Sequence, residues 1–216
     1  EVHFDIFEGA RLLEGLVRGR TWQDVSQIVS RICAICSSAH ALSSIKATED
    51  AFGIQVSPQT NLLRDLLYRG ESIESHALPL YFLAVPDYLD LHAATELIGA
   101  NTEAVQMGLR LKKLGNSIQE VIGGRAVHPV NAIVGGFGSA PTESQLIRLR
   151  ADLMVGMRDA AATIDLLATL PPADYCDVDT QFASLVSPGD FGYYAGTEMA
   201  IFTGDGKGGG KKTVVP

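Results

Sequence analysis

The chain has 216 residues, 46% of them hydrophobic, which is enough for one sizeable hydrophobic core. The formal net charge of −8, from 17 basic and 25 acidic residues, argues against a nucleic-acid-binding protein, which needs a basic face. Only 19% of the residues are charged, so we expect a partner or further chain to cover part of the surface, and no apolar run predicts a transmembrane segment.

The N-terminal stretch contains the first candidate for proton transfer. Residues 1–6 alternate apolar and polar side chains, which predicts a short strand. Residues 7–20 predict a short helix in which Glu14 lies among leucine and valine side chains. A solvated carboxylate is the commoner state of a glutamate, and a half-buried carboxylate suited to proton transfer is the alternative.

Helical patterns dominate the middle of the chain. Thr21 predicts the start of a helix that runs into a cysteine motif, and a second helix over 40–52 ends at Gly53. Ser57 and Pro58 predict the start of a third helix, which we expect to kink near Pro79.

The later part of the chain predicts two more helices. One long helix is expected over residues 91–121, followed by a glycine-rich irregular stretch over 123–138. Thr142 and Gln145 form a capping box that opens a helix ending before Pro171. The fold class predicted is therefore mainly α, a bundle of about five helices with a short N-terminal strand. Residues 1–172 form the helical core, and 173–216 form an irregular loop or tail.

The cysteine motif stands out in a chain with only three cysteines. If the helix continues through it, Cys33, Cys36 and His40 lie one turn apart on one face. A structural zinc site would need two more ligands, and a thioredoxin-like pair would follow a strand. Two buried core cysteines, or one half of a metal centre with its other ligands elsewhere, remain as alternatives. The spacing fits a secreted disulfide framework poorly and favours a reducing, cytoplasmic setting.

The motif and its surroundings resemble the large subunit of nickel–iron hydrogenases, whose first metal motif reads R-x-C-G-x-C-x-x-x-H. The style of the matching segments is most similar to the cytosolic, cofactor-coupled members of that family. The segments that carry the resemblance occur in the family's order: Arg11–Glu14 with Gly19-Arg20, Arg31–Cys36 with His40, Ser75–Asp87, and Gly124–Gly136 with His128 and Pro129.

The resemblance implies roles for five residues. Cys33 would be a terminal nickel ligand, and Cys36 would bridge nickel to an iron that carries cyanide and carbon monoxide. Glu14 would relay the proton and His40 would hydrogen-bond the bridging sulfur. Asp87 would hold an arginine from a segment that this chain does not contain. The implied activity is reversible oxidation of dihydrogen, and the implied partners are maturation proteins and an iron–sulfur small subunit.

Two departures from the family pattern qualify these expectations. Ala34 stands where the family usually has glycine. The family's C-terminal motif, which supplies the other two nickel ligands, has no counterpart, because Cys176 matches nothing in the family and is expected to be a core thiol. We therefore expect an inactive fragment of a larger hydrogenase large-subunit fold, with no nickel–iron centre bound. The alternatives are a cofactor-less quinone-pocket or scaffold homologue of the respiratory complex I type, and a helical interaction module.

Overall fold

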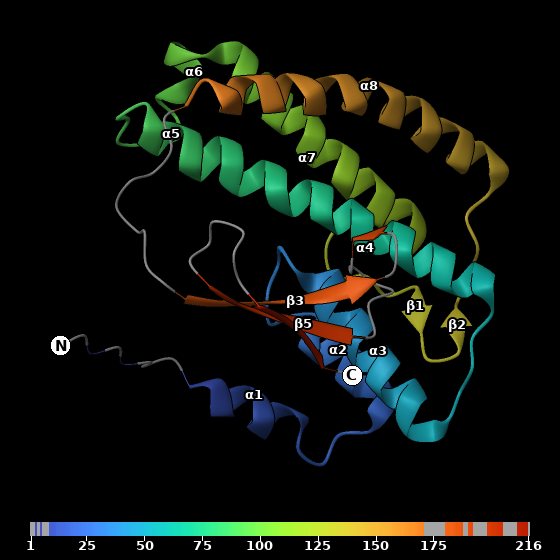
Figure 1. Cartoon of the computed structure of the whole chain (residues 1–216). Coiled ribbons are helices and arrows are strands. Elements are labelled where there is room, and N and C mark those ends of the chain that lie inside the picture. The colour runs from blue at the N-terminus through green and yellow to red at the C-terminus, as the bar shows by residue number, and fades with distance from the viewer. Residues whose placement is uncertain are drawn as a thin grey trace. The chain divides into compact units, whose positions relative to one another are not determined.

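The computed structural model describes residues 3, 5, 9–170, 180–187, 190–191, 198–204 and 211–215. It divides the chain into two compact units, Glu1–Ile164 and Asp165–Pro216. The mainly α fold class is confirmed (Figure 1). The helices are α1 (Ala10–Val17), α2 (Trp22–Val29), α3 (Ser37–Phe52), α4 (Pro58–Pro79), the π-helical η1 (Leu80–Ala84), α5 (Val85–Tyr88), α6 (Leu97–Ala100), α7 (Thr102–Gly123) and α8 (Glu143–Ala168).

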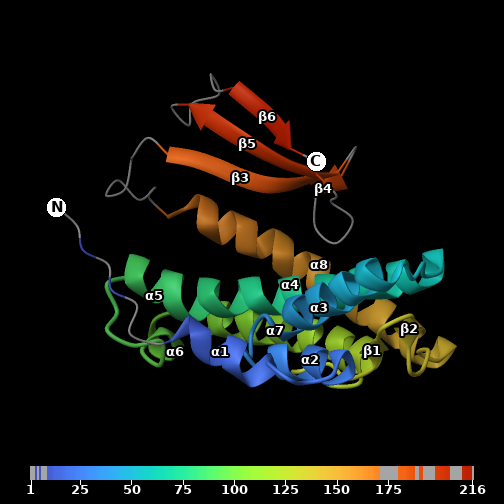
Figure 2. The same ribbon diagram turned by 90° about the horizontal axis from the view of Figure 1, so that it is seen from below.

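Helices α4 and α7 form the centre of the first unit, and they lie side by side in both views (Figures 1 and 2). Glycines allow this close approach. A Cβ at Gly115 of α7 would lie 2.5 Å from the carbonyl oxygen of Gly70 on α4, and a Cβ at Gly108 would lie 2.6 Å from the Tyr81 ring. Leu67, Ile118 and Ile122 fill the rest of the contact and are almost fully buried.

Helix α8 is attached to this pair by polar contacts. Asp159 of α8 accepts two hydrogen bonds from the Arg110 guanidinium of α7, at 2.8 and 2.7 Å. The Tyr81 hydroxyl lies 2.6 Å from the hydroxyl of Thr163. The capping box predicted for this helix is confirmed, since Thr142 N–H donates to Gln145 Oε1 at 2.8 Å and Gln145 N–H donates to Thr142 Oγ1 at 3.3 Å.

Two irregularities interrupt the predicted helices. The expected distortion near Pro79 is confirmed, because α4 passes there into the π-helical turn η1. The single long helix predicted over 91–121 is wrong. The described chain forms the short α6, and then Asn101 leaves helical geometry at φ −153° and caps α7 by accepting the Ala104 N–H at 3.0 Å.

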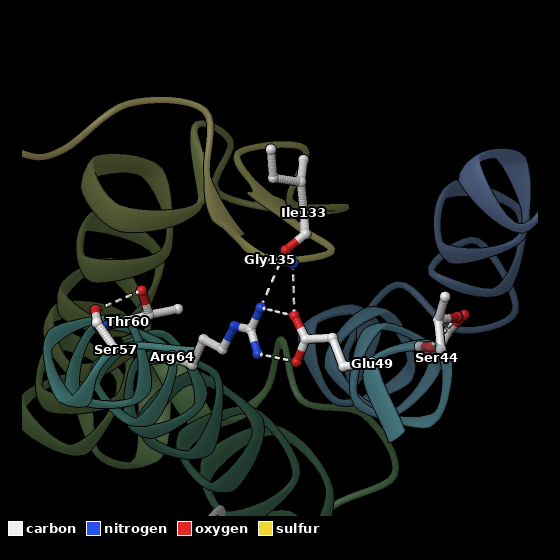
Figure 3. Close-up of polar contacts among 8 residues, drawn as sticks. Ser44, Glu49, Ser57, Thr60, Arg64, Ile133 and Gly135 are labelled. Carbon is white, nitrogen blue, oxygen red and sulfur yellow. Dashed lines mark hydrogen bonds and ion pairs between the residues drawn. The ribbon is translucent and has the colours of Figure 1, made fainter. Parts of the chain in front are cut away.

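A small hairpin, β1 (Ala132–Ile133) with β2 (Gly136–Phe137), occupies part of the glycine-rich stretch. A buried ion pair holds it against α3 and α4 (Figure 3). Arg64 donates to both carboxylate oxygens of Glu49, at 2.7 and 2.6 Å, and to the carbonyl of Ile133 at 3.0 Å. The N–H of Gly135 completes the cluster by donating to Glu49 at 2.7 Å.

The second unit contains an antiparallel sheet of order β4-β3-β5-β6 (Figure 2). Its strands are β3 (Thr180–Ser187), β4 (Asp190–Phe191), β5 (Glu198–Gly204) and β6 (Lys211–Val215). The sequence predicted an irregular tail here, and the described strands correct that. Short alternating segments such as Phe182–Val186 gain their stability from pairing across the sheet, which spacing alone does not reveal.

Some predictions fall where the structure gives no description. The predicted boundary after residue 172 and Cys176 both lie in 171–179, outside the described residues. Most of the predicted strand over 1–6 is also outside them, and the two residues described there, His3 and Asp5, are not in a strand.

Candidate metal centre

The two cysteines lie in a short loop between α2 and α3. Helix α2 ends at Val29, and Cys36 is the residue that immediately precedes α3. The prediction that a continuous helix carries both cysteines is therefore wrong. A tight turn brings them together instead, because the backbone N–H of Cys36 donates to the sulfur of Cys33 at 3.1 Å. Both thiols are free and half-buried.

The start of α3 is capped by a residue distant in sequence. No side chain of the loop itself caps the helix, so its first N–H groups need another acceptor. Glu71 of α4 supplies it: its carboxylate accepts the N–H of Ser38, and also the N–H of Ala39 at 3.0 and 3.2 Å from its two oxygens. Glu71 is only 3% exposed, so water does not compete for these bonds.

The same loop is fixed at both ends by α7 and the segment that follows it. Ser38 donates through its hydroxyl to Gln119 Oε1 at 2.9 Å. The backbone N–H of His128 donates to Ser37 Oγ at 3.0 Å, and its Nδ1 lies 2.8 Å from the carbonyl oxygen of Ser30. His128 has a φ of +57°, a left-handed conformation that non-glycine residues adopt infrequently. The serines and Gln119 are almost fully buried.

The two thiols differ in acidity because they interact with each other. The pKa of Cys33 is lowered, chiefly because the Cys36 side chain hydrogen-bonds to its sulfur. The pKa of Cys36 is raised to about 11, first by burial and then by the hydrogen bond to Cys33 and its charge. Burial likewise raises the pKa of Glu71 to about 7, against the hydrogen bonds from Ser38 and Ala39. Two thiolates beside a carboxylate therefore favour a bound cation as the compensating charge.

The donor set fits part of a metal centre. Cys33 and Cys36 supply two soft sulfur ligands from one turn, which suits nickel, iron or zinc. Across the parts of the chain that are described, no group of three or more histidine, cysteine, aspartate or glutamate side chains is placed to hold an ion. Ala34 fits the turn without strain, because it is exposed and its φ is not positive.

The other predicted site residues are placed less closely around the sulfurs. His40 is half-buried in the first turn of α3, one turn beyond Cys36. Glu14 is exposed on α1, so the half-buried alternative for this carboxylate is wrong and the solvated one is confirmed. Asp87 is exposed on α5. The structure thus brings the two cysteines together and leaves the roles of Glu14, His40 and Asp87 as predictions.

Sequence reasoning missed Glu71 and Gln119, which contact the loop directly. A usable signal existed for Glu71: with Leu67 and Glu74 it falls at helical spacing on the buried face of α4, where a carboxylate needs a partner. His128 was singled out with a packing or hydrogen-bonding role, and it has one. His76, also singled out, is exposed and lines an apolar groove of about 320 Å³ beside α7 and α8.

A helical unit with a clamped pair of thiols defines one side of a thiolate-ligated metal centre. Comparison with known proteins agrees with this class. The pattern of the nickel-dependent hydrogenase family matches residues 11–113. The alpha chain of sulfhydrogenase 2 from Pyrococcus furiosus is 46% identical over 144 residues, which cover 67% of this chain and 35% of the relative. The vhu F420-non-reducing hydrogenase of Methanocaldococcus jannaschii is 34% identical over 211 residues, covering 91% and 50%.

Solved structures show the same fold. A NAD+-reducing NiFe-hydrogenase in the H2-reduced state superposes with a TM-score of 0.84 at 24% identity, covering 88% of this chain and 46% of that one. The chain belongs to the nickel-dependent hydrogenase family and corresponds to the N-terminal portion of its large, or alpha, subunits. It spans half or less of the length of the curated relatives it matches. None of the described helices has the length and apolar character needed to cross a membrane.

Proposed function

We propose that a polypeptide containing this chain is the large subunit of a hydrogenase that interconverts dihydrogen with protons and electrons. The observation that carries the proposal is the pair of half-buried thiols, Cys33 and Cys36, joined by an N–H···S bond in a clamped loop. The family to which the chain belongs supplies the identity of the metals, because its relatives are nickel-dependent hydrogenases.

Cys33 and Cys36 are the residues that would hold the metals. By the family pattern, Cys33 would bind nickel, and Cys36 would bridge nickel to an iron carrying cyanide and carbon monoxide. When bound, such a centre supplies the heterolytic cleavage of dihydrogen. The chain's own contribution is to present two sulfur atoms at a fixed separation and to partly shield them from water. The remaining metal ligands would come from residues outside the described ones.

The supporting residues keep the roles that the family pattern implies. His40 would donate a hydrogen bond to the bridging sulfur from the first turn of α3, which also bears the Cys36 end of the loop. Glu14 would accept the proton at its carboxylate, and its exposure gives that proton a direct path to water. Asp87 would hold an arginine supplied by another segment. Electrons would leave through an iron–sulfur small subunit, in keeping with the names of relatives that are alpha subunits.

The setting of the protein follows from the same comparison. Cytosolic, cofactor-coupled hydrogenases are the members it resembles most in sequence style, and we place it in the cytoplasm with maturation proteins as transient partners. Residues 1–216 by themselves would be inactive, because two thiolates are only part of the metal ligand set. The centre would form only in a polypeptide that brings the other ligands.

A second candidate, a helical interaction module, is favoured by the apolar side chains exposed on α8. They are Ile147, Met154, Val155, Met157 and Ile164, each at least 56% exposed. Such a surface is typical of a protein-binding face. The two candidates differ in the cysteines, because a pure interaction module would retain its partner and its stability when Cys33 is replaced by serine.

The experiment that tests the hydrogenase proposal is infrared spectroscopy of the polypeptide produced together with its maturation proteins. We expect the cyanide and carbon monoxide stretching bands, bound nickel and hydrogen uptake in the wild type. Cys36→Ser should lose all three, while Ser43→Ala, a neighbouring change in α3, should keep them. Wild-type protein that is folded, carries no nickel and shows none of these bands would refute the proposal.

A further inference from the structure

The start of α3 depends on a contact that crosses 33 residues of sequence. Helix N-termini leave N–H groups without an acceptor, and the residue before the helix commonly supplies one from its side chain. The residue in that position here is Cys36, and its side chain makes no such bond. The acceptor is the buried Glu71 carboxylate on α4, which binds the N–H groups of Ser38 and Ala39.

This contact passes directly to the two sulfur atoms. The first hydrogen bond within α3 runs from His40 N–H to the carbonyl of Cys36, at 3.2 Å. The N–H of Cys36 in turn donates to the sulfur of Cys33. An unbroken series of bonds thus leads from Glu71 through the helix start to Cys33. Shifting the start of α3 by one residue would rotate Cys36 and break the N–H···S bond.

The surroundings leave the loop no other arrangement of comparable quality. Ser37 and Ser38 are fully buried, so their polar groups must find partners within the protein. Gln119 and His128 supply those partners, and His128 does so with a left-handed backbone. Such backbone conformations persist where the surrounding structure holds them in place. Glu71 is the charged member of this set, and hydrogen bonds to charged acceptors are the stronger ones.

We propose that Glu71 is a positioning residue: by capping α3 from α4, it fixes where the helix begins and so holds the Cys33 and Cys36 sulfur atoms in one mutual geometry for joint metal binding. The metal-binding part of this inference rests on the proposed function, whereas the capping part does not. Glu71 itself does not touch the metal in this proposal. Its effect passes through Ser38, Ala39 and the backbone of Cys36.

The test uses the full chain with Glu71→Ala, Glu71→Gln and the matched control Glu74→Gln. Glu74 is also buried on α4, but it pairs with Lys112 at 3.3 Å rather than with α3. The first measurement is amide hydrogen exchange at Ser38 and Ala39. In Glu71→Ala we expect exchange at least about fivefold faster, the size that follows from loss of a helix cap. Glu71→Gln should lie between it and wild type, and Glu74→Gln should match wild type.

The second measurement is titration with cobalt(II) alone, followed by the thiolate-to-cobalt absorption band. Wild type should bind with both sulfurs, and Glu71→Ala should bind at least about tenfold more weakly, as for other residues that orient metal ligands. If Glu71→Ala does not fold by circular dichroism, Glu71→Gln decides: faster exchange and weaker binding than wild type support the proposal.

Two results would overturn the inference. Unchanged exchange at Ser38 and Ala39 in a folded Glu71 variant would mean that the cap does not hold the helix start. Equal losses in Glu74→Gln would mean that the effect is general destabilisation. Failure of wild type to bind cobalt would count against the proposed metal function alone, because the exchange measurement tests the capping without any metal.

Discussion

Arg64 of α4 and Glu49 of α3 form a two-bond ion pair in the interior of the first unit, at 2.7 and 2.6 Å (Figure 3). Arg64 is fully buried and Glu49 is 6% exposed. The pair also receives the Gly135 N–H and reaches the Ile133 carbonyl, so it joins two helices to the β1–β2 hairpin. Burial by itself would raise the pKa of Glu49, but the bonds from Arg64 and Gly135 hold it below its ordinary value.

Breaking this pair from one side should be costly. We expect Arg64→Met to lower the free energy of unfolding by about 3–5 kcal/mol, because it leaves Glu49 buried without its counter-charge. The double variant Arg64→Met with Glu49→Leu should lose less than the sum of the two single variants. Urea unfolding of all four proteins measures this coupling. Additivity within about 0.5 kcal/mol would contradict it.

The crossing of α4 and α7 should not tolerate a methyl group at Gly115. A Cβ there would lie 2.5 Å from the Gly70 carbonyl oxygen and 2.6 Å from the Glu74 nitrogen, both backbone atoms that cannot rotate away. Gly115→Ala should therefore destabilise the fold by about 1–3 kcal/mol through overpacking. Gly15→Ala in α1, where nothing lies within 4 Å, is the matched control and should be neutral or slightly stabilising. Equal denaturation midpoints for the two variants would refute the close crossing.

The stability of the first unit should depend on pH through Glu71. Its pKa is about 7 in the folded chain and 4.5 in the reference state, so the folded state binds more protons between these values. The contribution of Glu71 is therefore fully present below pH 4.5 and is lost as pH rises through 7. The loss is on the order of 3 kcal/mol, from about 1.4 kcal/mol for each pH unit.

Thermal or urea unfolding between pH 4.5 and 8 measures this loss, with Glu71→Gln as the control. The glutamine variant lacks the titrating proton, so its stability relative to wild type should rise across the window. A constant difference between the two proteins from pH 4.5 to 8 would show that Glu71 does not titrate there.

Local signals in the sequence were sufficient for several features of the fold. Ser57 does cap α4, by accepting the Thr60 N–H at 3.1 Å, and Gly53 ends α3 with a φ of +66°. Each of these depends on residues within one helical turn. The break at Asn101 was missed because apolar periodicity continues on both sides of it, and only the cap geometry reveals the new helix start.

The site was predictable only in part, for a related reason. The pairing of Cys33 with Cys36 follows from their separation of three residues. The helical trace was wrong because the chain leaves α2 at Val29, and this is set by contacts with partners far along the sequence. Glu71, Gln119 and His128 are between 32 and 98 residues from the groups they hold, and no periodic pattern reports such distances.

The central claim is that Cys33 and Cys36 together hold the metals of a nickel-dependent hydrogenase. The most direct test is the nickel content of the purified, matured polypeptide that contains this chain, compared between wild type and Cys33→Ser. The account predicts bound nickel and hydrogen uptake in wild type, and loss of both in a Cys33→Ser protein that still folds. A folded Cys33→Ser variant with wild-type nickel content and hydrogen uptake would contradict it.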